Sequence, residues 1–502
     1  MTPIRASLLV SSLAAVGVAQ AQTAAAPAPT PAPAPAPAPP KADSSLTWNG
    51  ITLYGIVDVG LQYQTHGVPI SDYFPAGSES IISKNSNHSI TGITPNNLSQ
   101  SRIGLSGLEP LGSTDVSFVF RLETFFNPHS GNLSDALKSQ VLNNGKPLAE
   151  QGTTVDSSVA GQIFAGAAYA GFSSASLGSL TFGRHVTPLA DGIAKYDPMG
   201  AAQAFSVIGF SGTAAGGGDT ENRRLDQSVK YTGKFGFVHI GALYQFNGSN
   251  GAGNTAAQFQ LGGELAGASV DAYYAKKKGA IATSSLSATQ VNQLSGVPQT
   301  DPVTGNPIPV CTATPAAGSK APPCVSVDNA LAATISDNTT YSIMGLYNFG
   351  AVKIYAGYEN IKFENPDTSI EPGFITIGGY QLAFTNNTAY TSNKTLEVVW
   401  AGAKWAITPE FEVTGSYYGY RQKAFATGAN AGCDTSANAA CKGQLNAFSL
   451  LADYKFSKRF DGYLGTMWSG VEDGLANGYL LKSPTGNSAA TITTTLGMRF
   501  KF

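Results

Sequence analysis

Charged residues are scarce in this chain. Only 12% of its 502 residues are Asp, Glu, Lys or Arg, against roughly 25% in ordinary soluble domains. The net charge is -2 at neutral pH, so there is no basic excess that would favour binding to nucleic acid. Long apolar runs are missing too: beyond the N-terminus, no stretch of about 18 apolar residues could span a bilayer as a helix. Low charge, many aromatic residues and no apolar block indicate a chain that places apolar side chains at every second position.

Cysteine is also rare. The chain has four, in two local pairs, Cys311 with Cys324 and Cys433 with Cys441. Small residues or proline flank each pair, so in an exported protein the pairs predict two loop disulfides. No Cys-x-x-Cys motif or Cys/His cluster suggests a metal site, and we expect no cofactor. No histidine stands in a motif that would imply a nucleophile and its base, which argues against an enzyme. The five histidines are His66, His88, His129, His185 and His239.

The N-terminus has the three parts of a secretory signal peptide, which we assign to residues 1–21. Arg5 supplies the positive charge, an apolar core follows, and Ala19-Gln20-Ala21 provides a small-x-small cleavage site. Residues 22–48 are rich in Pro and Ala, a composition that buries no core and favours an extended polyproline II spacer of about 50 Å. We therefore expect an exported chain with a periplasmic linker, which is either an unstructured tail or a tether toward the cell wall.

From Asn49 to the C-terminus, apolar and polar residues alternate in one segment after another. In Thr491–Phe502 the even positions are apolar except for Thr494 and end in two aromatics, whereas the odd positions are Thr, Gly, Arg and Lys. Charges at every second position need water on that face, while the other face needs lipid or a core. These segments therefore predict the strands of a membrane barrel. We count sixteen, near residues 51–64, 99–108, 115–126, 161–173, 176–186, 224–231, 235–247, 256–266, 268–278, 339–349, 351–362, 394–406, 409–424, 444–457, 459–471 and 490–502.

The connections between these segments alternate between short turns and long loops, with one brief exception near residues 248–255. An up-and-down barrel has short turns at its periplasmic rim and long loops outside, and an even number of strands puts both termini at the short-turn rim. Residues 49–502 are therefore predicted to form a 16-stranded antiparallel transmembrane up-and-down β-barrel. Long loops are expected near 65–98, 127–160, 187–222, 279–338, 363–393, 425–443 and 472–489.

Several short motifs occur in a fixed order along these strands. They are Leu53-Tyr-Gly-Ile-Val-Asp58, Ser101-Arg-Ile-Gly-Leu-Ser-Gly107, Val119-Phe-Arg-Leu-Glu123, Thr181-Phe-Gly-Arg184, Arg224-Leu-Asp-Gln-Ser-Val-Lys-Tyr231, Tyr454-Lys-Phe-Ser-Lys-Arg459 and the terminal Phe502. In these motifs the sequence resembles the general porins of Gram-negative bacteria, specifically their β-proteobacterial branch, over nearly the whole chain after the Pro/Ala segment. The resemblance implies homotrimers in the cell outer membrane, in contact with the lipid bilayer and lipopolysaccharide. Their water-filled channels let small hydrophilic solutes and ions diffuse passively.

The resemblance also implies a constriction, because the family folds its third long loop into the pore to face wall arginines. Here that loop corresponds to Thr187–Asn222. Its acidic residues are Asp191, Asp197, Asp219 and Glu221. The wall arginines that carry over are Arg102, Arg121 and Arg224, all of which alternation also places on the water face. Three wall arginines predict a mild anion preference; the alternative is that they are lumen residues away from the narrowest point.

Two further residues receive a role from the resemblance. Alternation puts Arg184 with Leu180 and Phe182 on the outer face, where a lone charge facing lipid is costly. A carboxylate from a neighbouring subunit would relieve that cost, so we expect Arg184 at the subunit interface; the alternative is a bulge that turns it inward. In the family the last strand, which ends here in Phe502, is read by the barrel-insertion machinery.

Two other functions compete with a general porin. A substrate-specific channel would show saturable flux of one solute, whereas a general porin shows flux limited by solute size. The long outer loops would also suit an adhesin or phage receptor, a role that can coexist with conduction.

Overall fold

The computed structural model describes residues 46–66, 88–133, 136–147, 150, 163–210, 223–246, 255–295, 299–300, 307–308, 327–377, 379–425, 440–476 and 488–502. The chain divides into two units, Met1–Asp43 and Ser44–Phe502. The predicted signal peptide and nearly all of the predicted linker lie outside the described residues, as do Cys311, Cys324 and Cys433. Cys441 is disulfide-bonded; its pairing with Cys433 stays a prediction, because Cys433 lies outside the described residues. None of the described helices has the length and apolar content needed to cross a membrane.

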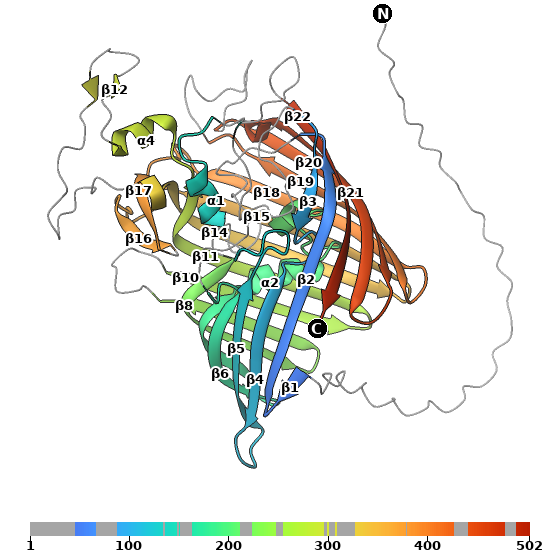
Figure 1. The fold of residues 1–502 in the computed structure, drawn as a ribbon. Coiled ribbons are helices and arrows are strands. Elements are labelled where there is room, and N and C mark those ends of the chain that lie inside the picture. The colour runs from blue at the N-terminus through green and yellow to red at the C-terminus, as the bar shows by residue number, and fades with distance from the viewer. Residues whose placement is uncertain are drawn as a thin grey trace, which may run out of the picture. The chain divides into compact units, whose positions relative to one another are not determined.

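Sixteen strands of the described chain form a closed antiparallel ring (Figure 1). Each pairs with the next along the chain, and the last pairs with the first, with Val57 opposite Phe500. This confirms the predicted 16-stranded barrel, which leaves no open sheet edge. The strands are β2 (Ile51–Gln64), β4 (Arg102–Pro110), β5 (Val116–Phe125), β6 (Ala167–Ser174), β7 (Gly178–Val186), β8 (Arg224–Phe235), β9 (Val238–Gln245), β10 (Ala256–Leu265), β11 (Ala268–Ser284), β14 (Ala330–Phe349), β15 (Val352–Glu364), β18 (Lys394–Ala406), β19 (Phe411–Gln422), β20 (Gly443–Lys455), β21 (Phe460–Asp473) and β22 (Ser488–Lys501).

The last strand shows why alternation predicted the barrel. Leu496 and Met498 of β22 are 57% and 53% exposed on the outer surface, whereas the preceding Thr495 is buried. The end of the chain is held in place as well. The amide of Phe502 donates to the carbonyl of Gly55 at 3.0 Å, and the amide of Gly55 donates to the carbonyl of Phe502 at 2.9 Å. The final residue therefore closes the barrel instead of fraying into water.

Exposed aromatic side chains gather at the rim formed by the short turns. Such a girdle is expected where a barrel meets the membrane interface, because an aromatic ring suits a surface that is part apolar and part wet. Its members include Trp48, Phe235, Phe237, Phe349, Trp405 and Phe456. Trp48 belongs to the short strand β1 (Thr47–Trp48), which pairs with the start of β2.

The long loops contain structure that alternation alone did not predict. Strand β11 ends at Ser284 and β14 begins at Ala330, whereas the predicted limits were near 278 and 339. The extensions follow a register shift between Lys277 and Ala280. The extensions persist because they pack apolar side chains against α1 (Ala136–Leu142) and β17 (Tyr380–Asn386). The other added elements are β3 (Ile90–Pro95), α2 (Pro188–Tyr196), α3 (Val207–Phe210), α4 (Ala288–Leu294), β12 (Gln299–Thr300), β13 (Pro307–Ile308), η4 (Val327–Asn329), β16 (Phe374–Ile377) and η6 (Gly474–Ala476).

Candidate pore constriction

The third long loop enters the barrel as the short helix α2. Thr187 caps its N-terminus by accepting a hydrogen bond from the amide of Ala190 at 3.2 Å, and Pro188 occupies the first turn. Asp191 lies in the first turn and Lys195 in the last, where each charge complements the helix dipole. These local signals explain why a helix begins directly after β7.

The loop is anchored on an apolar part of the inner wall. Ile193 and Tyr196 of α2 are fully buried in one cluster with Trp400 of β18. The indole nitrogen of Trp400 donates to the carbonyl of Tyr196 at 3.0 Å. Further along, Ser449 Oγ donates to the carbonyl of Phe205 at 2.6 Å. A water-filled barrel would not line this wall with apolar side chains, so the wall is built to hold the loop.

Asp197 belongs to this anchor. Its carboxylate accepts hydrogen bonds from Tyr418 Oη of β19 at 2.5 Å and from the amides of Met199 and Ala201 at 3.1 and 2.8 Å. Only 2% of the residue is exposed, and burial raises the pKa of the Asp197 carboxyl. Sequence alone predicted a constriction acid here. The structure instead buries Asp197 against the wall, because the loop turns directly after α2.

The other side of the loop is held by the segment between β3 and β4. The amide of Ala204 donates to the carbonyl of Asn97 at 3.0 Å, and Gln203 Nε2 donates to Gln100 Oε1 at 3.1 Å. The loop therefore bridges two parts of the barrel interior.

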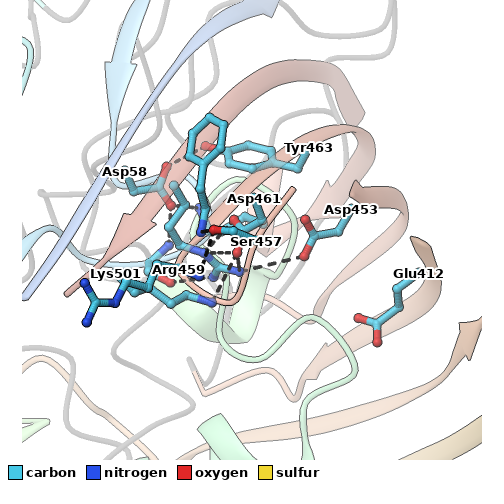
Figure 2. Close-up of polar contacts among 12 residues, drawn as sticks. Asp58, Glu412, Asp453, Ser457, Arg459, Asp461, Tyr463 and Lys501 are labelled. Atoms are coloured by element: carbon cyan, nitrogen blue, oxygen red, sulfur yellow. Dashed lines mark hydrogen bonds and ion pairs between the residues drawn. The ribbon is translucent and has the colours of Figure 1, made fainter. Parts of the chain in front are cut away.

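That segment is itself fixed by a buried polar cluster at the junction of β2, β21 and β22 (Figure 2). Asp58 of β2 accepts hydrogen bonds from the amides of Leu98 and Ser99 at 2.9 and 2.7 Å and from Tyr463 Oη. Arg499 Nη1 donates to Ser99 Oγ at 2.8 Å, while its Nε and Nη2 bind Asp461. The polar face of the last strand thus contributes to positioning the loop.

Opposite the anchored wall, a cavity of about 670 Å³ remains between α2 and strands β2 and β4–β8. Most of the residues that line it are polar or charged. From the wall come Arg121, Lys230 and the aromatic pair Tyr169 and His185, whose rings stack at 4.9 Å. From the loop comes Asp191. Basic wall residues and an acid of α2 therefore face the same space.

Glu123 organises the arginines of this wall. Its carboxylate lies 2.5 Å from Arg121 Nη2 and 3.7 Å from Arg102 Nη1, and Tyr54 Oη donates to it at 3.1 Å. Arg121 Nε in turn donates to Tyr54 Oη at 2.7 Å. Glu123 is buried, while the Arg121 side chain remains 38% exposed. Arg121 therefore presents its charge to the cavity from a fixed position.

Arg224 is also close to Glu123 but does not line the cavity. Its Nε donates to the carbonyl of Gly166 at 2.9 Å, and its guanidinium carbon lies 4.7 Å from the centre of the Phe125 ring. Gly166 is in turn close to Glu123, because a Cβ atom added there would lie 2.6 Å from Glu123 Oε1. The three predicted arginines thus gather around one carboxylate, and Arg121 is the one that lines the cavity.

On the loop side, Asp191 forms an ion pair with Lys230 of β8. Asp191 Oδ2 lies 2.6 Å from Lys230 Nζ, which also donates to the carbonyl of Val186 at 2.9 Å. Asp191 is 55% exposed and Lys230 13%. The other predicted loop acids, Asp219 and Glu221, lie outside the described residues.

Neither Lys230 nor Glu123 is among the site residues predicted from the sequence. Alternation had placed both on the polar face of their strands, and that signal was available. Alternation does not show where along the barrel axis a lumen residue lies relative to the loop. That position decides whether the residue faces the constriction.

Arg184 lies at an irregularity of the barrel wall. Gly183 has φ of 139°, and the pairing of β7 with β8 shifts register between Gly183 and His185. Arg184 Nη1 lies 2.6 Å from Asp226 Oδ1, and Arg184 Nε donates to the carbonyl of Ala165 at 2.9 Å. A carboxylate of the same chain thus already compensates the charge, so the subunit interface at Arg184 stays a prediction.

Comparison with known proteins identifies the family. A sequence model of the family described as Gram-negative porin matches residues 6–473. The chain belongs to the Gram-negative porins. This porin is therefore an outer-membrane channel and not an enzyme. None of the curated protein sequences compared matches it, and its placement in the β-proteobacterial branch stays a prediction.

Solved structures of distant porins have the same fold. OmpT of Vibrio cholerae expressed in the outer membrane is 13% identical, with a TM-score of 0.50 over 91% of this porin and 99% of OmpT. The OmpT mutant lacking loop L8 is 12% identical, with a TM-score of 0.50 over 90% and 99%. In-vitro folded OmpT in its trimer form is 13% identical, with a TM-score of 0.49 over 90% and 99%. At this identity the likeness concerns the fold alone.

Proposed function

We propose that small hydrophilic solutes and ions diffuse passively through this porin, past a charged constriction between α2 and the wall of β4–β8. The observation that carries the proposal is that Arg121 from the wall and Asp191 from the loop line one cavity of about 670 Å³. A water-filled passage removes the dehydration cost that lipid imposes on polar solutes, and the loop sets the size limit.

The charges around the constriction support a mild anion preference. Among the described residues, cations outnumber carboxylates here by two, because four basic residues surround two acids. Low-dielectric walls concentrate the resulting field in the passage and raise the local concentration of anions. The basic residues are Arg102, Arg121, Arg224 and Lys230, and the acids are Glu123 and Asp191.

Recording from the purified porin in planar bilayers tests this proposal. We expect large stepwise conductance that rises linearly with salt, and a reversal potential displaced toward anions under a salt gradient. Absence of conductance steps would contradict the channel, and a reversal potential displaced toward cations would contradict the charge assignment.

A substrate-specific channel is the second candidate, and one observation favours it. Six serine and threonine hydroxyl side chains line the cavity, and such a lining could guide a polyhydroxylated solute by successive hydrogen bonds. Saturation of flux by one sugar, with inhibition of ion current, would support specificity over general diffusion. The six residues are Thr52, Ser106, Ser173, Ser179, Thr181 and Thr232.

We also propose that the porin works as a homotrimer, surrounded by lipid and lipopolysaccharide, with the β7–β8 wall around Arg184 at the subunit contact. Support comes from the trimer form recorded for OmpT of Vibrio cholerae. Cysteine cross-linking at positions flanking Arg184 should yield covalent trimers, whereas cross-linking only at distant walls would place the contact elsewhere.

A further inference from the structure

Arg421 lies on the outer face of the barrel, far from the constriction. Tyr418 and Tyr420 of β19 point inward, where their hydroxyls bind Asp197 and the carbonyl of Val207. Because side chains alternate along a strand, Arg421 points outward. It lies ten positions along the strand from Phe411 at the short-turn rim. That distance corresponds to roughly 25 Å along the barrel axis after allowing for strand tilt. Arg421 therefore sits at the outer edge of the apolar band, where the lipid headgroups begin.

The guanidinium of Arg421 is held by neutral acceptors. Nη1 donates to the carbonyls of Tyr420 and Leu445 at 2.8 and 3.2 Å. Nη2 donates to Asn446 Oδ1 at 2.9 Å and lies 3.4 Å from Tyr417 Oη. These contacts fix the plane of the group against the wall without neutralising its charge.

The nearest carboxylate in the strand register is engaged elsewhere. Glu397 of β18 stands opposite Arg421, yet its Oε1 lies 3.1 Å from Lys423 Nζ. Within the described part of the chain, Arg421 makes no ion pair. A charged side chain that faces lipid without an ion-pair partner in its own chain indicates a functional site. We therefore expect an anion from outside the chain to bind it.

An apolar surface lies next to the Arg421 guanidinium, on the side of the membrane interior. Tyr417, Phe448 and Trp468 stand side by side across β19, β20 and β21, with ring centres 5.0 and 6.0 Å apart. Phe448 and Trp468 are 54% and 39% exposed. The patch thus combines a fixed guanidinium at headgroup level with an aromatic surface at acyl-chain level.

The position of the patch favours lipid over a neighbouring subunit. Seven strands separate β19 from β7 in either direction around the ring. Arg421 therefore lies on the wall opposite Arg184, where the subunit contact is proposed.

We propose that Arg421 and Asn446 bind a phosphate group of a phosphorylated glycolipid in the outer leaflet, whose acyl chains pack on Tyr417, Phe448 and Trp468. The guanidinium can donate charge-assisted hydrogen bonds to phosphate oxygens with a geometry that an ammonium group cannot reproduce. This assigns a site to the proposed lipopolysaccharide partner and does not depend on how the pore selects solutes.

Native mass spectrometry of the detergent-purified porin, titrated with bisphosphorylated lipid A or with lipid A lacking phosphate, tests the site. We expect R421Q to weaken binding of the bisphosphorylated form about tenfold and to leave binding of the phosphate-free form unchanged. K362Q is the matched control, because Lys362 also points outward near this rim but is paired with Glu364 at 2.9 Å. Its effect should stay within about twofold.

Two outcomes would overturn the proposal. One is equal binding of both lipids by R421Q and the wild type. The other is a lower trimer dissociation temperature in R421Q with unchanged lipid affinity, which would make the external anion a carboxylate of a second subunit. Heat-dependent gel mobility verifies that R421Q is folded. Unchanged single-channel conductance in R421Q keeps this test separate from the proposed function of the pore.

Discussion

Glu123 determines how the arginines of the constriction behave. Three guanidinium groups gathered this closely, from β4, β5 and β8, would repel one another in a site of low dielectric. The carboxylate of Glu123, in contact with Arg102 and Arg121, offsets part of that repulsion and fixes the orientation of Arg121. Because Glu123 is buried and Arg121 is not, a solute passing through the cavity meets the positive group first.

Asp197 should make the stability of the anchored loop depend on pH. Burial raises its pKa above the ordinary value of 3.8, so the folded state holds the proton more tightly than the unfolded state. Its contribution to stability is therefore full below about pH 3.8 and is lost as the pH rises through the raised pKa.

In D197N that pH-dependent contribution is absent. We expect the thermal unfolding midpoint of D197N to fall further below the wild-type midpoint at pH 4 than at pH 7. Circular dichroism melts at both pH values measure the gap, and a gap that widens with rising pH would contradict this assignment.

At the residue scale, sequence alone could predict which face of a strand a charge occupies, but not what it contacts. Alternation placed Arg121 and Arg224 on the water face, and both lie inside the barrel. It could not show that Arg121 lines the cavity while Arg224 packs on Phe125, because that difference depends on the side chains of the neighbouring strands. The burial of Asp197 could not be predicted from the sequence either, because it depends on a loop packing against Tyr418 of β19.

Among the elements, β18 differs from an ordinary barrel strand because both of its faces carry apolar residues. Leu396, Val398 and Trp400 point inward and are buried under the loop, while Val399 points outward. This double pattern is visible in the sequence and indicates a wall covered from inside. It is the signal that would have located the anchor of the third long loop.

Replacing Trp400 should loosen that anchor. The ring fills space above Gly357 and donates to the carbonyl of Tyr196, so W400A is expected to lower the free energy of unfolding by about 3–5 kcal/mol. The freed loop should also produce larger and noisier single-channel currents. Trp405, which is 52% exposed on the outer face of the same strand, provides the control: W405A should leave the current noise unchanged. Equal noise in both variants would show that the loop is held by other contacts.

On the scale of the whole molecule, the pairing of β22 with β2 closes the ring, and the last residue extends that pairing by two hydrogen bonds to Gly55. Alternation predicted the sixteen strands because their charge pattern is imposed by lipid on one side and water on the other. It did not predict the extensions of β11 and β14, which leave the membrane and are stabilised by contacts with α1 and β17 instead.

Deleting Phe502 should harm assembly more than conduction. The deletion removes both backbone hydrogen bonds to Gly55 and the terminal ring that stacks on Phe500. We expect the yield of folded barrel in outer-membrane fractions to fall about tenfold, roughly the effect of losing two hydrogen bonds, while the conductance of each assembled channel stays the same. A normal yield with altered conductance would contradict this role.

The central claim is that wall arginines set the charge selectivity of the pore. The most direct test is the reversal potential of the R121Q/R224Q double variant under a potassium chloride gradient in planar bilayers, with R421Q as a control that loses a positive charge outside the pore. The account predicts a shift toward cations in the double variant and none in R421Q. An unchanged reversal potential in the double variant would contradict it.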